Sequence, residues 1–596
     1  MAHTPPRASS AANTAHSAAL SHEGLIGCVL AVTDDVLGFL QNWRQWRGVP
    51  KRPPVLHHVM LCSQAPLALH IQELAHNHPA LAPLAQALAA RCFGLIDGFH
   101  RLLFEQGKVQ LTLCIGKPLA TLKQQYFKAD IIELDTHTLD PAWDDLPRLL
   151  APLCRQGTVV RWIHKPPVNQ ITQTWISKGF CAIQTNANSD QKTFARFDPP
   201  WQIKDRRGPG HGGAAHRRRC MVIGAGLAGA AVAAVLARRG WEVTVLDARA
   251  QPADGASGVP VGLLVAHLSK DDCPLSQASR SGVRMTLAQA SELLSAGQDW
   301  KQTGVFERNV KGKLQTPPTW SEHGDDWCVL TFEDKAAPSE KAKAQAVFHR
   351  PAGWLKPAAL VRAWLSQPGI RVQTSAPVHQ VQMEGQRWHA LTEDGQSLGE
   401  ADLMVLANAL DAQALVQRLK PAKPDTLENP RRLARMRGMR GLLSSGRQSA
   451  VEAASWPAYP INGNGFAMAG IPFDEGLRWF AGASYQDLDQ SERSDIENHR
   501  HNLEHLHAMA PDLASLVTPA LQEGRIEGWK GVRCTTHDHL PVVGPIDAKQ
   551  YPGLWACVGL GSRGLSLAVL CAETLAAQIG SEPLPLPVRL VRKLSP

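Results

Sequence analysis

Short apolar runs alternate with longer helical stretches in the C-terminal two-thirds of the chain. The first run, Cys220–Ile223, is followed by an Ala-rich stretch that ends at Arg239, just before Gly240. A second run covers Glu242–Leu246. A short uninterrupted apolar run is typical of a parallel strand buried on both faces, and a glycine that can adopt positive φ often ends a helix. The pattern predicts a strand–helix–strand unit.

Two later segments continue this pattern. Asp402–Ala409 is an apolar run that ends in small residues, and Leu554–Val558 leads into a glycine-rich turn and another helical stretch. Strands that alternate with helices form a mostly parallel sheet with helices on both faces. We therefore predict an α/β fold.

Composition divides the chain into four parts. Residues 1–22 are small and polar and are predicted to form a disordered tail, and residues 23–200 form a globular segment. Residues 201–219 contain KDRRGPGHGGAAHRRR, a basic, Gly-rich run typical of a linker. Its arginines are either solvated or in contact with RNA phosphate. Residues 220–596 form the α/β part.

A dinucleotide-binding fingerprint joins the first two predicted strands. Gly224 allows the tight strand-to-helix turn, Gly226 lets the backbone approach a pyrophosphate, and Gly229 lets the helix pack closely on the strand. The N-terminus of the helix presents free N–H groups to the phosphates. Asp247 ends the second strand, about twenty residues further on, where a carboxylate accepts hydrogen bonds from the ribose hydroxyls.

The second glycine-rich turn favours FAD over NAD. Its residues follow the strand Leu554–Val558, and its backbone N–H groups can reach an isoalloxazine ring; they include Gly561, Ser562, Gly564 and Leu565. No His or Cys lies in a recognisable attachment motif, so we expect non-covalent FAD. The cofactor-binding parts are predicted at about 220–300, 350–435 and 530–596, in a two-dinucleotide-type domain. An inserted α+β substrate domain is predicted at about 301–349 and 436–529.

Bulk properties set limits on the class of protein. A chain of 596 residues with 44% hydrophobic and 19% charged residues is typical of two or three globular domains. The net charge of +9 suits RNA as a partner, but many basic enzymes bind none. The 12 Cys show no C-x-x-C or zinc-site spacing, so we expect reduced thiols and no metal. Without a signal pattern or an apolar run of about 18 residues, we expect a cytoplasmic protein with no membrane segment.

The C-terminal motifs resemble the glycine oxidase/D-amino-acid oxidase superfamily of flavoenzymes. They are Arg533, Asp538–Gly544 and Gly561–Leu565. Within that superfamily, the chain resembles the oxidoreductase half of the bifunctional tRNA-modification family MnmC. This resemblance rests on the stretches Gly255–Gly258, Leu268–Asp272, Gly482–Tyr485 and Glu582–Leu586.

The resemblance also implies a reaction and a set of residues. The family's oxidase half removes the carboxymethyl group of 5-carboxymethylaminomethyl-uridine in tRNA and leaves aminomethyl. The resemblance also implies that Ser257 and Gly258 contact the cofactor, although Val259 stands where the family usually has Asn. An arginine fork suits the substrate carboxylate. Arg533 and Arg563 are therefore the candidates, with Tyr459 as a third, and structural ion pairs are the alternative role for the arginines.

The N-terminal segment resembles the S-adenosylmethionine-dependent methyltransferase half of the same family. Leu37–Arg47 resembles the helix after the cofactor loop, and Leu56–Val59 resembles the second strand. This likeness implies a Rossmann-like domain that carries out the second step, methylation to 5-methylaminomethyl-2-thiouridine.

The catalytic pieces of that domain depart from the family pattern. Where the family has a glycine-rich loop, Val29–Val36 contains no glycine, and a backbone crowded by Cβ atoms cannot approach a cofactor closely. Cys62 stands where an acid should hold the ribose, and only Asp135 remains of the active-site loop. The residues predict a degenerate domain without S-adenosylmethionine, whereas the full-length resemblance implies a bifunctional enzyme. Holding tRNA, or packing against the oxidase, would explain why the domain persists.

Three functions remain open from the sequence. The first is a tRNA-modifying FAD oxidoreductase with a degenerate methyltransferase domain. The second is an oxidase of a small free amino acid or amine, although such a substrate needs neither the basic linker nor the N-terminal domain. The third is a tRNA-binding flavoprotein with little catalysis. The sequence does not define the oligomeric state, the tRNAs chosen or the electron acceptor.

Overall fold

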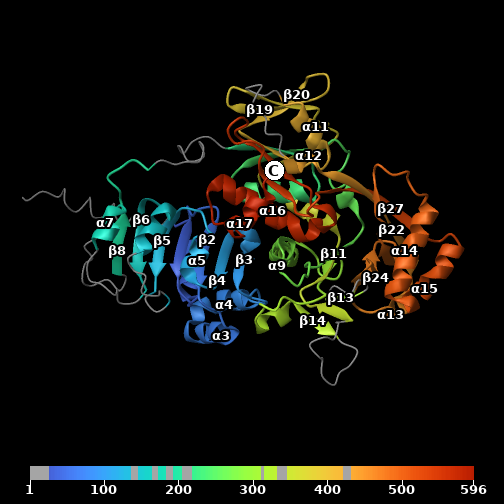
Figure 1. The fold of residues 1–596 in the computed structure, drawn as a ribbon, viewed down its shortest axis with the longest axis horizontal. Helices are drawn as coiled ribbons and strands as arrows, with labels where there is room; N and C mark the ends of the chain where they lie inside the picture. The colour runs from blue at the N-terminus through green and yellow to red at the C-terminus, as the bar shows by residue number, and fades with distance from the viewer. Residues whose placement is uncertain are drawn as a thin grey trace, which may run out of the picture.

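The computed structural model describes residues 26–135, 138, 145–163, 172–182, 192–203, 218–309, 314–331, 345–419 and 431–596. The expected tail at 1–22 and most of the expected linker, 204–217, lie outside the described residues. Figure 1 shows the N-terminal part in blue and cyan on one side, a central α/β part, and the orange β22–β27 and α13–α15 region on the other side.

An eight-stranded sheet, counted over the described residues, forms the N-terminal part. Its central strands β4, β2, β1, β5 and β6 are parallel, and β3, β8 and β7 are added antiparallel at the edges. In spatial order the strands are β3 (Gly98–Phe104), β4 (Val109–Ile115), β2 (Leu56–Cys62), β1 (Cys28–Val32), β5 (Ala129–Leu134), β6 (Cys154–Trp162), β8 (Lys192–Phe197) and β7 (Phe180–Ala182). This is the doubly wound arrangement predicted for a Rossmann-like domain.

Helices cover both faces of this sheet. One face packs against α2 (Leu37–Gly48), α3 (Ala68–Asn77) and α4 (Ala82–Ala89). The other face packs against α5 (Pro118–Leu122), α6 (Leu146–Leu150) and α7 (Gln173–Ser177). Side chains alternate between the two cores along each strand, because successive residues of a strand point to opposite faces.

A six-stranded sheet, again within the described residues, forms the central part. Its order is β17 (Ile370–Gln373), β10 (Glu242–Leu246), β9 (Arg219–Ile223), β21 (Leu403–Leu406), β29 (Leu554–Val558) and β28 (Val542–Pro545), with only β28 antiparallel. The helices α8 (Leu227–Arg238), α9 (Pro274–Leu293), α10 (Pro357–Leu365) and α16 (Gly564–Gly580) share one core with it. The predicted strands at 220–223, 242–246 and 554–558 are all present, and the glycine turns at 224–229 and 561–564 follow β9 and β29, the two strands that flank β21.

A larger, mainly antiparallel sheet forms the predicted substrate part. Its strands are β14 (Cys328–Thr331), β15 (Ala346–His349), β13 (Val305–Arg308), β23 (Ile461–Gly463), β24 (Gly465–Phe473), β25 (Gly476–Gly482), β22 (Arg437–Gln448), β26 (Gln486–Asp487) and β27 (Glu527–Thr535). The helices α13 (Ala450–Ala454), α14 (Asp495–Met509) and α15 (Pro511–Gln522) lie beside it. β27 pairs with β22 as far as Thr535, so this sheet continues past the division expected at about 530.

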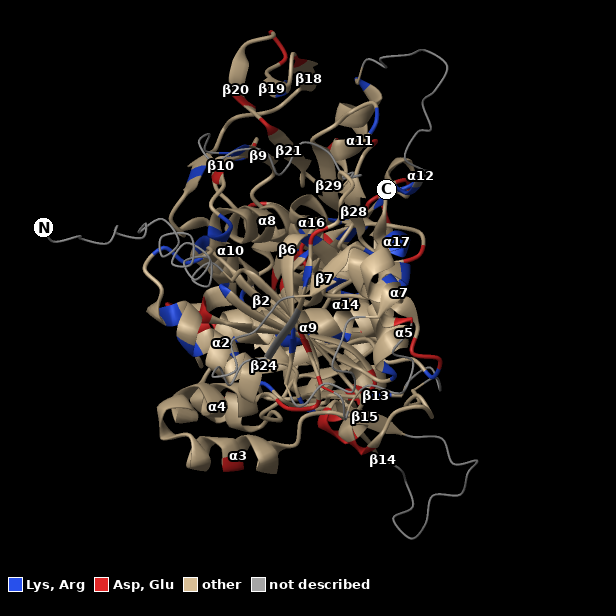
Figure 2. Cartoon of the chain, turned by 90° about the vertical axis from the view of Figure 1, so that its left-hand side faces the viewer, with Lys and Arg blue, Asp and Glu red and all other residues tan. Residues whose placement is uncertain are grey.

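Smaller elements complete the chain. A three-stranded ribbon of β18 (Gln380–Glu384), β19 (Arg387–Leu391) and β20 (Ser397–Ala401) projects from the central part in Figures 1 and 2. Beside it lie α11 (Asp411–Gln417) and α12 (Arg431–Ala434). A second three-stranded sheet joins β11 (Gly262–Leu264), β16 (Gly353–Leu355) and β12 (Trp300–Lys301), and α17 (Val588–Leu594) ends the fold. Within the described ranges, no helix has the length and apolar character needed to cross a membrane.

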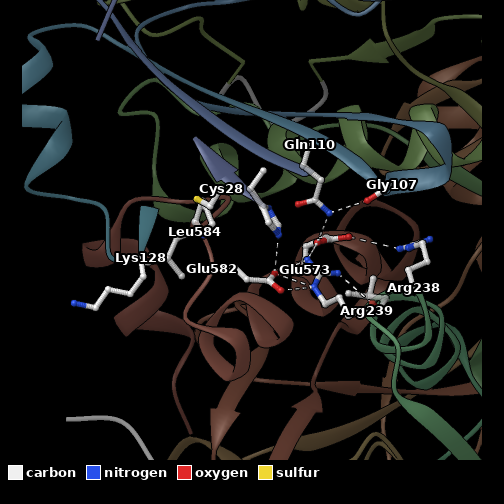
Figure 3. A network of polar contacts seen from close by, with 12 residues as sticks. Cys28, Gly107, Gln110, Lys128, Arg238, Arg239, Glu573, Glu582 and Leu584 are labelled. Carbon is white, nitrogen blue, oxygen red and sulfur yellow. Dashed lines mark hydrogen bonds and ion pairs between the residues drawn. The ribbon is translucent and has the colours of Figure 1, made fainter. Parts of the chain in front are cut away.

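A buried ionic network joins the N-terminal and central parts (Figure 3). Glu573 of α16 is fully buried and pairs with Arg239 at 2.8 Å and with Arg238 at 3.5 Å, both at the end of α8. From the N-terminal sheet, Gln110 donates a hydrogen bond to Glu573 at 3.0 Å. Burial opposes ionisation of Glu573, but the neighbouring arginines lower the pKa of its carboxyl group below the usual value. The carboxylate therefore ties α8, α16 and the N-terminal sheet together.

Further contacts extend this interface. His57 on β2 lies 3.3 Å from Glu582, which also accepts a hydrogen bond from Arg239 at 2.8 Å. Arg284 of α9 donates to the carbonyl oxygens of Arg91, at 2.9 Å, and of Phe93, at 2.5 Å. These contacts satisfy buried polar groups across the interface, as a fixed contact between domains requires.

Candidate FAD site and a second cofactor edge

The first glycine turn is shaped for a close backbone approach. Gly224 has φ +107°, and a Cβ there would lie 2.6 Å from the carbonyl oxygen of Ala407 on the neighbouring connection. A Cβ at Gly229 would lie 1.8 Å from the carbonyl oxygen of Gly224. Both positions therefore exclude side chains. The N-terminus of α8 consequently sits directly over the end of β9, as a pyrophosphate site requires.

Two side chains close around this turn. Asp247 accepts hydrogen bonds from the backbone N–H of Ala225 at 2.6 Å and of Arg249 at 2.8 Å, which fixes its carboxylate at the end of β10. Ser257 lies in the short helix η5 (Ala256–Gly258), and its hydroxyl accepts from Leu227 N–H at 2.9 Å. A hydroxyl that accepts one hydrogen bond still has a proton to donate to a phosphate oxygen. Next to it, a Cβ at Gly258 would lie 2.6 Å from the carbonyl oxygen of Ala253.

The second glycine turn lies against the first. It forms the short helix η7 (Gly561–Arg563) and leads into α16. A Cβ at Gly564 would lie 2.9 Å from Leu227 Cδ1 on α8. Leu565 is buried and Ser562 is exposed. Both η5 and η7 contact β27, so Ser257, the second glycine turn and the strand that carries Arg533 lie close together.

Arg533 is held in a setting that suits an anionic ligand. Its guanidinium stacks over the Tyr485 ring at 4.6 Å from the ring centroid. Its Nη1 is buried and has no hydrogen-bond partner among the described residues. A Cβ at Gly441 would lie 2.3 Å from this nitrogen, so the glycine makes room for it. An unpaired buried donor costs about 1–3 kcal/mol.

Arg563 lies next to charged groups that sequence reasoning did not identify. Burial lowers the pKa of Arg563, and the charge of Glu307 opposes that shift. Glu307 is paired with His349 at 2.9 Å. Burial and the charge of Arg563 lower the pKa of His267 to about 4, so this imidazole is neutral at neutral pH. Tyr485 is thus near both candidate arginines, and it is the last residue of the stretch Gly482–Tyr485.

Tyr459 has a different environment. Its ring packs against Phe306 and Phe348, with ring centroids 6.0 and 5.5 Å away. Phe306 precedes Glu307 in β13, and neighbouring strand residues point to opposite faces. The aromatic cluster and the Glu307 side chain therefore occupy opposite faces of this sheet. Arg533 stacks on Tyr485, and the strand that carries Arg533 contacts η7, which carries Arg563, whereas Tyr459 lies in the aromatic cluster.

A second strand-to-helix edge occurs in the N-terminal part, between β1 and α2. Here Thr33, Asp34 and Asp35 replace the glycines, and the side chains of Thr33 and Asp34 bond to residues just after the neighbouring strands. Asp34 accepts hydrogen bonds from Ser63, at 2.7 Å from N–H and 2.5 Å from the hydroxyl, just after β2. Thr33 donates to Asp135, after β5, at 3.4 Å. The loop is therefore fixed to the ends of both flanking strands.

The same edge lacks the groups that would hold S-adenosylmethionine. Asp35 accepts a hydrogen bond from Leu37 N–H at 2.8 Å, so a protein carboxylate occupies the N-terminus of α2. Cys62, at the expected ribose position, is fully buried, and burial raises the pKa of its thiol. A neutral buried thiol cannot replace a carboxylate as an acceptor for ribose hydroxyls. The residues present do not fit this cofactor.

Known proteins resemble this chain over its flavin part and over most of its length. The family model described as FAD dependent oxidoreductase matches residues 219–578, which include both glycine turns. A tRNA 5-methylaminomethyl-2-thiouridine biosynthesis bifunctional protein MnmC of Albidiferax ferrireducens is 40% identical over 584 residues, covering 94% of this chain and 90% of that protein. The protein of the same name in a Polaromonas species is 40% identical over 582 residues, covering 94% and 88%. Glycine oxidase from Geobacillus kaustophilus is 19% identical with a TM-score of 0.48, covering 64% of this chain and 98% of that chain.

Proposed function

The chain belongs to the family of tRNA 5-methylaminomethyl-2-thiouridine biosynthesis bifunctional proteins, MnmC, and from that premise we propose how its flavin half acts. It is an FAD-dependent oxidoreductase that acts on a CH–NH bond in tRNA modification. The sequence-based predictions of FAD as cofactor and of this family are confirmed. The reaction converts 5-carboxymethylaminomethyl-(2-thio)uridine to 5-aminomethyl-(2-thio)uridine.

The chemistry balances as a two-electron oxidation followed by hydrolysis. When bound, FAD accepts a hydride from the carbon that lies between the amine nitrogen and the carboxylate. The nitrogen loses one proton, so an imine forms on the substrate. Water adds to that imine and the C–N bond breaks, giving the aminomethyl nucleoside and glyoxylate. The protein's task is to orient the C–H bond and to anchor the carboxylate.

The pair Arg533 and Arg563 is our candidate for the carboxylate anchor. The observation that carries this assignment is the buried, unpaired Nη1 of Arg533 beside the flavin-binding turns. Tyr485 stacks on Arg533 and so limits the directions in which its fork can point. His267, neutral at neutral pH, adds no positive charge to compete for the carboxylate.

We propose tRNA as the substrate from the names of the relatives and from the net charge of this chain. The curated relatives are named for tRNA modification, and this chain carries a net charge of +9. A positive protein attracts polyanions through long-range electrostatics. We place tRNA as the partner and the cytoplasm as the compartment on these grounds.

Anaerobic mixing with modified tRNA tests the proposal. The FAD-loaded protein is mixed with tRNA that carries the carboxymethylaminomethyl group at the wobble uridine, and flavin absorbance is followed. We expect bleaching of the flavin band and release of one glyoxylate per flavin reduced. The same tRNA without the carboxymethyl group is the control and leaves the flavin oxidised. Bleaching by free glycine or sarcosine, but not by the modified tRNA, would replace this proposal with a small-amine oxidase.

A further inference from the structure

The N-terminal edge has the topology of a cofactor site but not its chemistry. β1, β2 and β5 are adjacent parallel strands, and their carboxyl ends meet where a doubly wound sheet binds its ligand. A relative that is named as a bifunctional protein is 40% identical over an alignment that covers 94% of this chain. We propose that this chain binds no S-adenosylmethionine and releases its product as the unmethylated primary amine.

The loop after β1 is closed by its own side chains. Thr33 is 3% exposed and Val36 is fully buried, so both side chains turn into the fold. The hydroxyl of Thr33 also accepts from Asp35 N–H at 3.1 Å. The loop thus makes its hydrogen bonds internally and to Ser63, His70 and Asp135. A cofactor would have to displace several bonds at once to reach the backbone.

A negative charge already lies at the N-terminus of α2. Free N–H groups and the helix dipole there favour an anionic ligand group, such as the cofactor's methionine carboxylate. Asp35 already supplies that negative charge through its bond to Leu37 N–H. A second carboxylate at the same place would meet like-charge repulsion.

The position expected to bind the cofactor's ribose also lacks a suitable acceptor. Cys62 is buried at the end of β2, its thiol 3.9 Å from the carbonyl oxygen of Cys114. No carboxylate occurs at this position to accept two ribose hydroxyls. Two separate halves of the cofactor therefore lose their contacts.

The consequence is a place in a reaction sequence. Given the proposed oxidase step, the product is a primary amine on the wobble uridine. Its conversion to methylaminomethyl needs a methyl group transferred from a sulfonium donor to that nitrogen, which then loses a proton. A separate sulfonium-dependent N-methyltransferase must therefore consume the product of this chain.

Direct binding measurements test the inference without using the oxidase. The full-length, FAD-loaded protein is titrated with S-adenosylmethionine by calorimetry, and the Albidiferax ferrireducens relative is the positive control. We expect binding at least about a hundredfold weaker than that of the relative, since about 1.4 kcal/mol is lost per tenfold. Affinity within tenfold of the relative overturns the proposal.

A second measurement supplies tRNA that already carries the aminomethyl group. It is incubated with the protein and S-adenosylmethionine, and its nucleosides are analysed by mass spectrometry. We expect the aminomethyl nucleoside to remain, while the relative converts it to methylaminomethyl. Appearance of the methylated nucleoside overturns the inference. Because this tRNA bypasses oxidation, failure of the oxidase proposal would leave the test unaffected.

Discussion

The chain contains two strand-to-helix edges of the same design with opposite chemistry. At the β9–α8 edge, Gly224 and Gly229 keep side chains away, and Ser257 offers a hydroxyl beside the helix N-terminus. At the β1–α2 edge, the corresponding hydrogen bond, from the first N–H of the helix, is accepted by the carboxylate of Asp35. The hydroxyl can accept from the helix and donate to a phosphate, whereas the carboxylate can only accept. Topology alone therefore does not make a cofactor site; the residues on the turn decide whether one can bind.

The largest effect is expected from a side chain placed on the open edge. Gly229→Ala would put its Cβ 1.8 Å from the Gly224 carbonyl oxygen, so α8 must move away from β9. We expect a destabilisation of about 4 kcal/mol or more, at the exceptional end for one substitution, and loss of bound FAD. The flavin absorbance of the purified protein, relative to protein absorbance, measures the outcome.

Gly240→Ala is the matched control for that substitution. Gly240 follows the same helix at φ +85°, but nothing lies within 4 Å of its Cβ position. Only the left-handed backbone is penalised, at about 1–2 kcal/mol, and FAD should remain. If both variants lose FAD equally, the steric account of the open edge is wrong.

Much of this open edge could be predicted from the sequence, because its signals are local. The run Cys220–Ile223, the glycines and Asp247 lie within 28 residues, and each has a fixed geometric role. The closed edge is partly local too, since the absence of glycine in Val29–Val36 predicts it. The bond from Leu37 N–H to Asp35 had a signal that sequence reasoning missed, because Asp is a typical residue near the start of a helix.

The substrate side could not be predicted to the same degree. The strand β27, which carries Arg533, contacts η7, which carries Arg563, and no local sequence pattern encodes this long-range contact. Glu307 looks in sequence like one polar residue in a half-buried strand. Its pairing with His349 and its proximity to Arg563 arise only from the folded sheet.

A second prediction concerns the buried ionic network between the N-terminal and central parts. Glu573→Gln removes the fully buried charge that pairs with Arg238 and Arg239. Removing one partner of a buried ion pair costs about 3–5 kcal/mol, because the remaining charges stay desolvated. We expect a lower midpoint in thermal or denaturant unfolding, and separate transitions for the two parts of the chain.

Glu475→Gln is the control for the network. This carboxylate pairs with Arg447 at 2.9 Å, but both side chains are more than 60% exposed. Exposed pairs contribute about 0–1 kcal/mol, so the unfolding midpoint should barely change. An equal effect of the two substitutions would mean that the buried network does not join the two parts.

A third prediction tests the substrate anchors at the open edge. Arg533→Ala and Arg563→Ala should each lower kcat/KM for modified tRNA about a hundredfold, or about 2.7 kcal/mol at 1.36 kcal/mol per tenfold. FAD content should be unchanged, because neither side chain is proposed to hold the cofactor. Lys at either position keeps the charge but loses the planar fork, so a smaller loss is expected. Loss of FAD in the Ala variants would instead assign the arginines a structural role.

The smallest effect is expected from the pH dependence of stability in the N-terminal part. Burial lowers the pKa of His58 on β2 and of His100 on β3 to about 3, whereas an unfolded His titrates near about 6.5. Between those values the unfolded state binds more protons, so stability falls as pH drops below about 6.5. At pH 5.5 each histidine should remove about 1.4 kcal/mol relative to pH 7.5. His58→Leu removes one titrating group, so the loss of unfolding free energy between these pH values should shrink by about that amount, whatever the substitution does to stability at pH 7.5. An unchanged loss would show that His58 is not kept neutral in the fold.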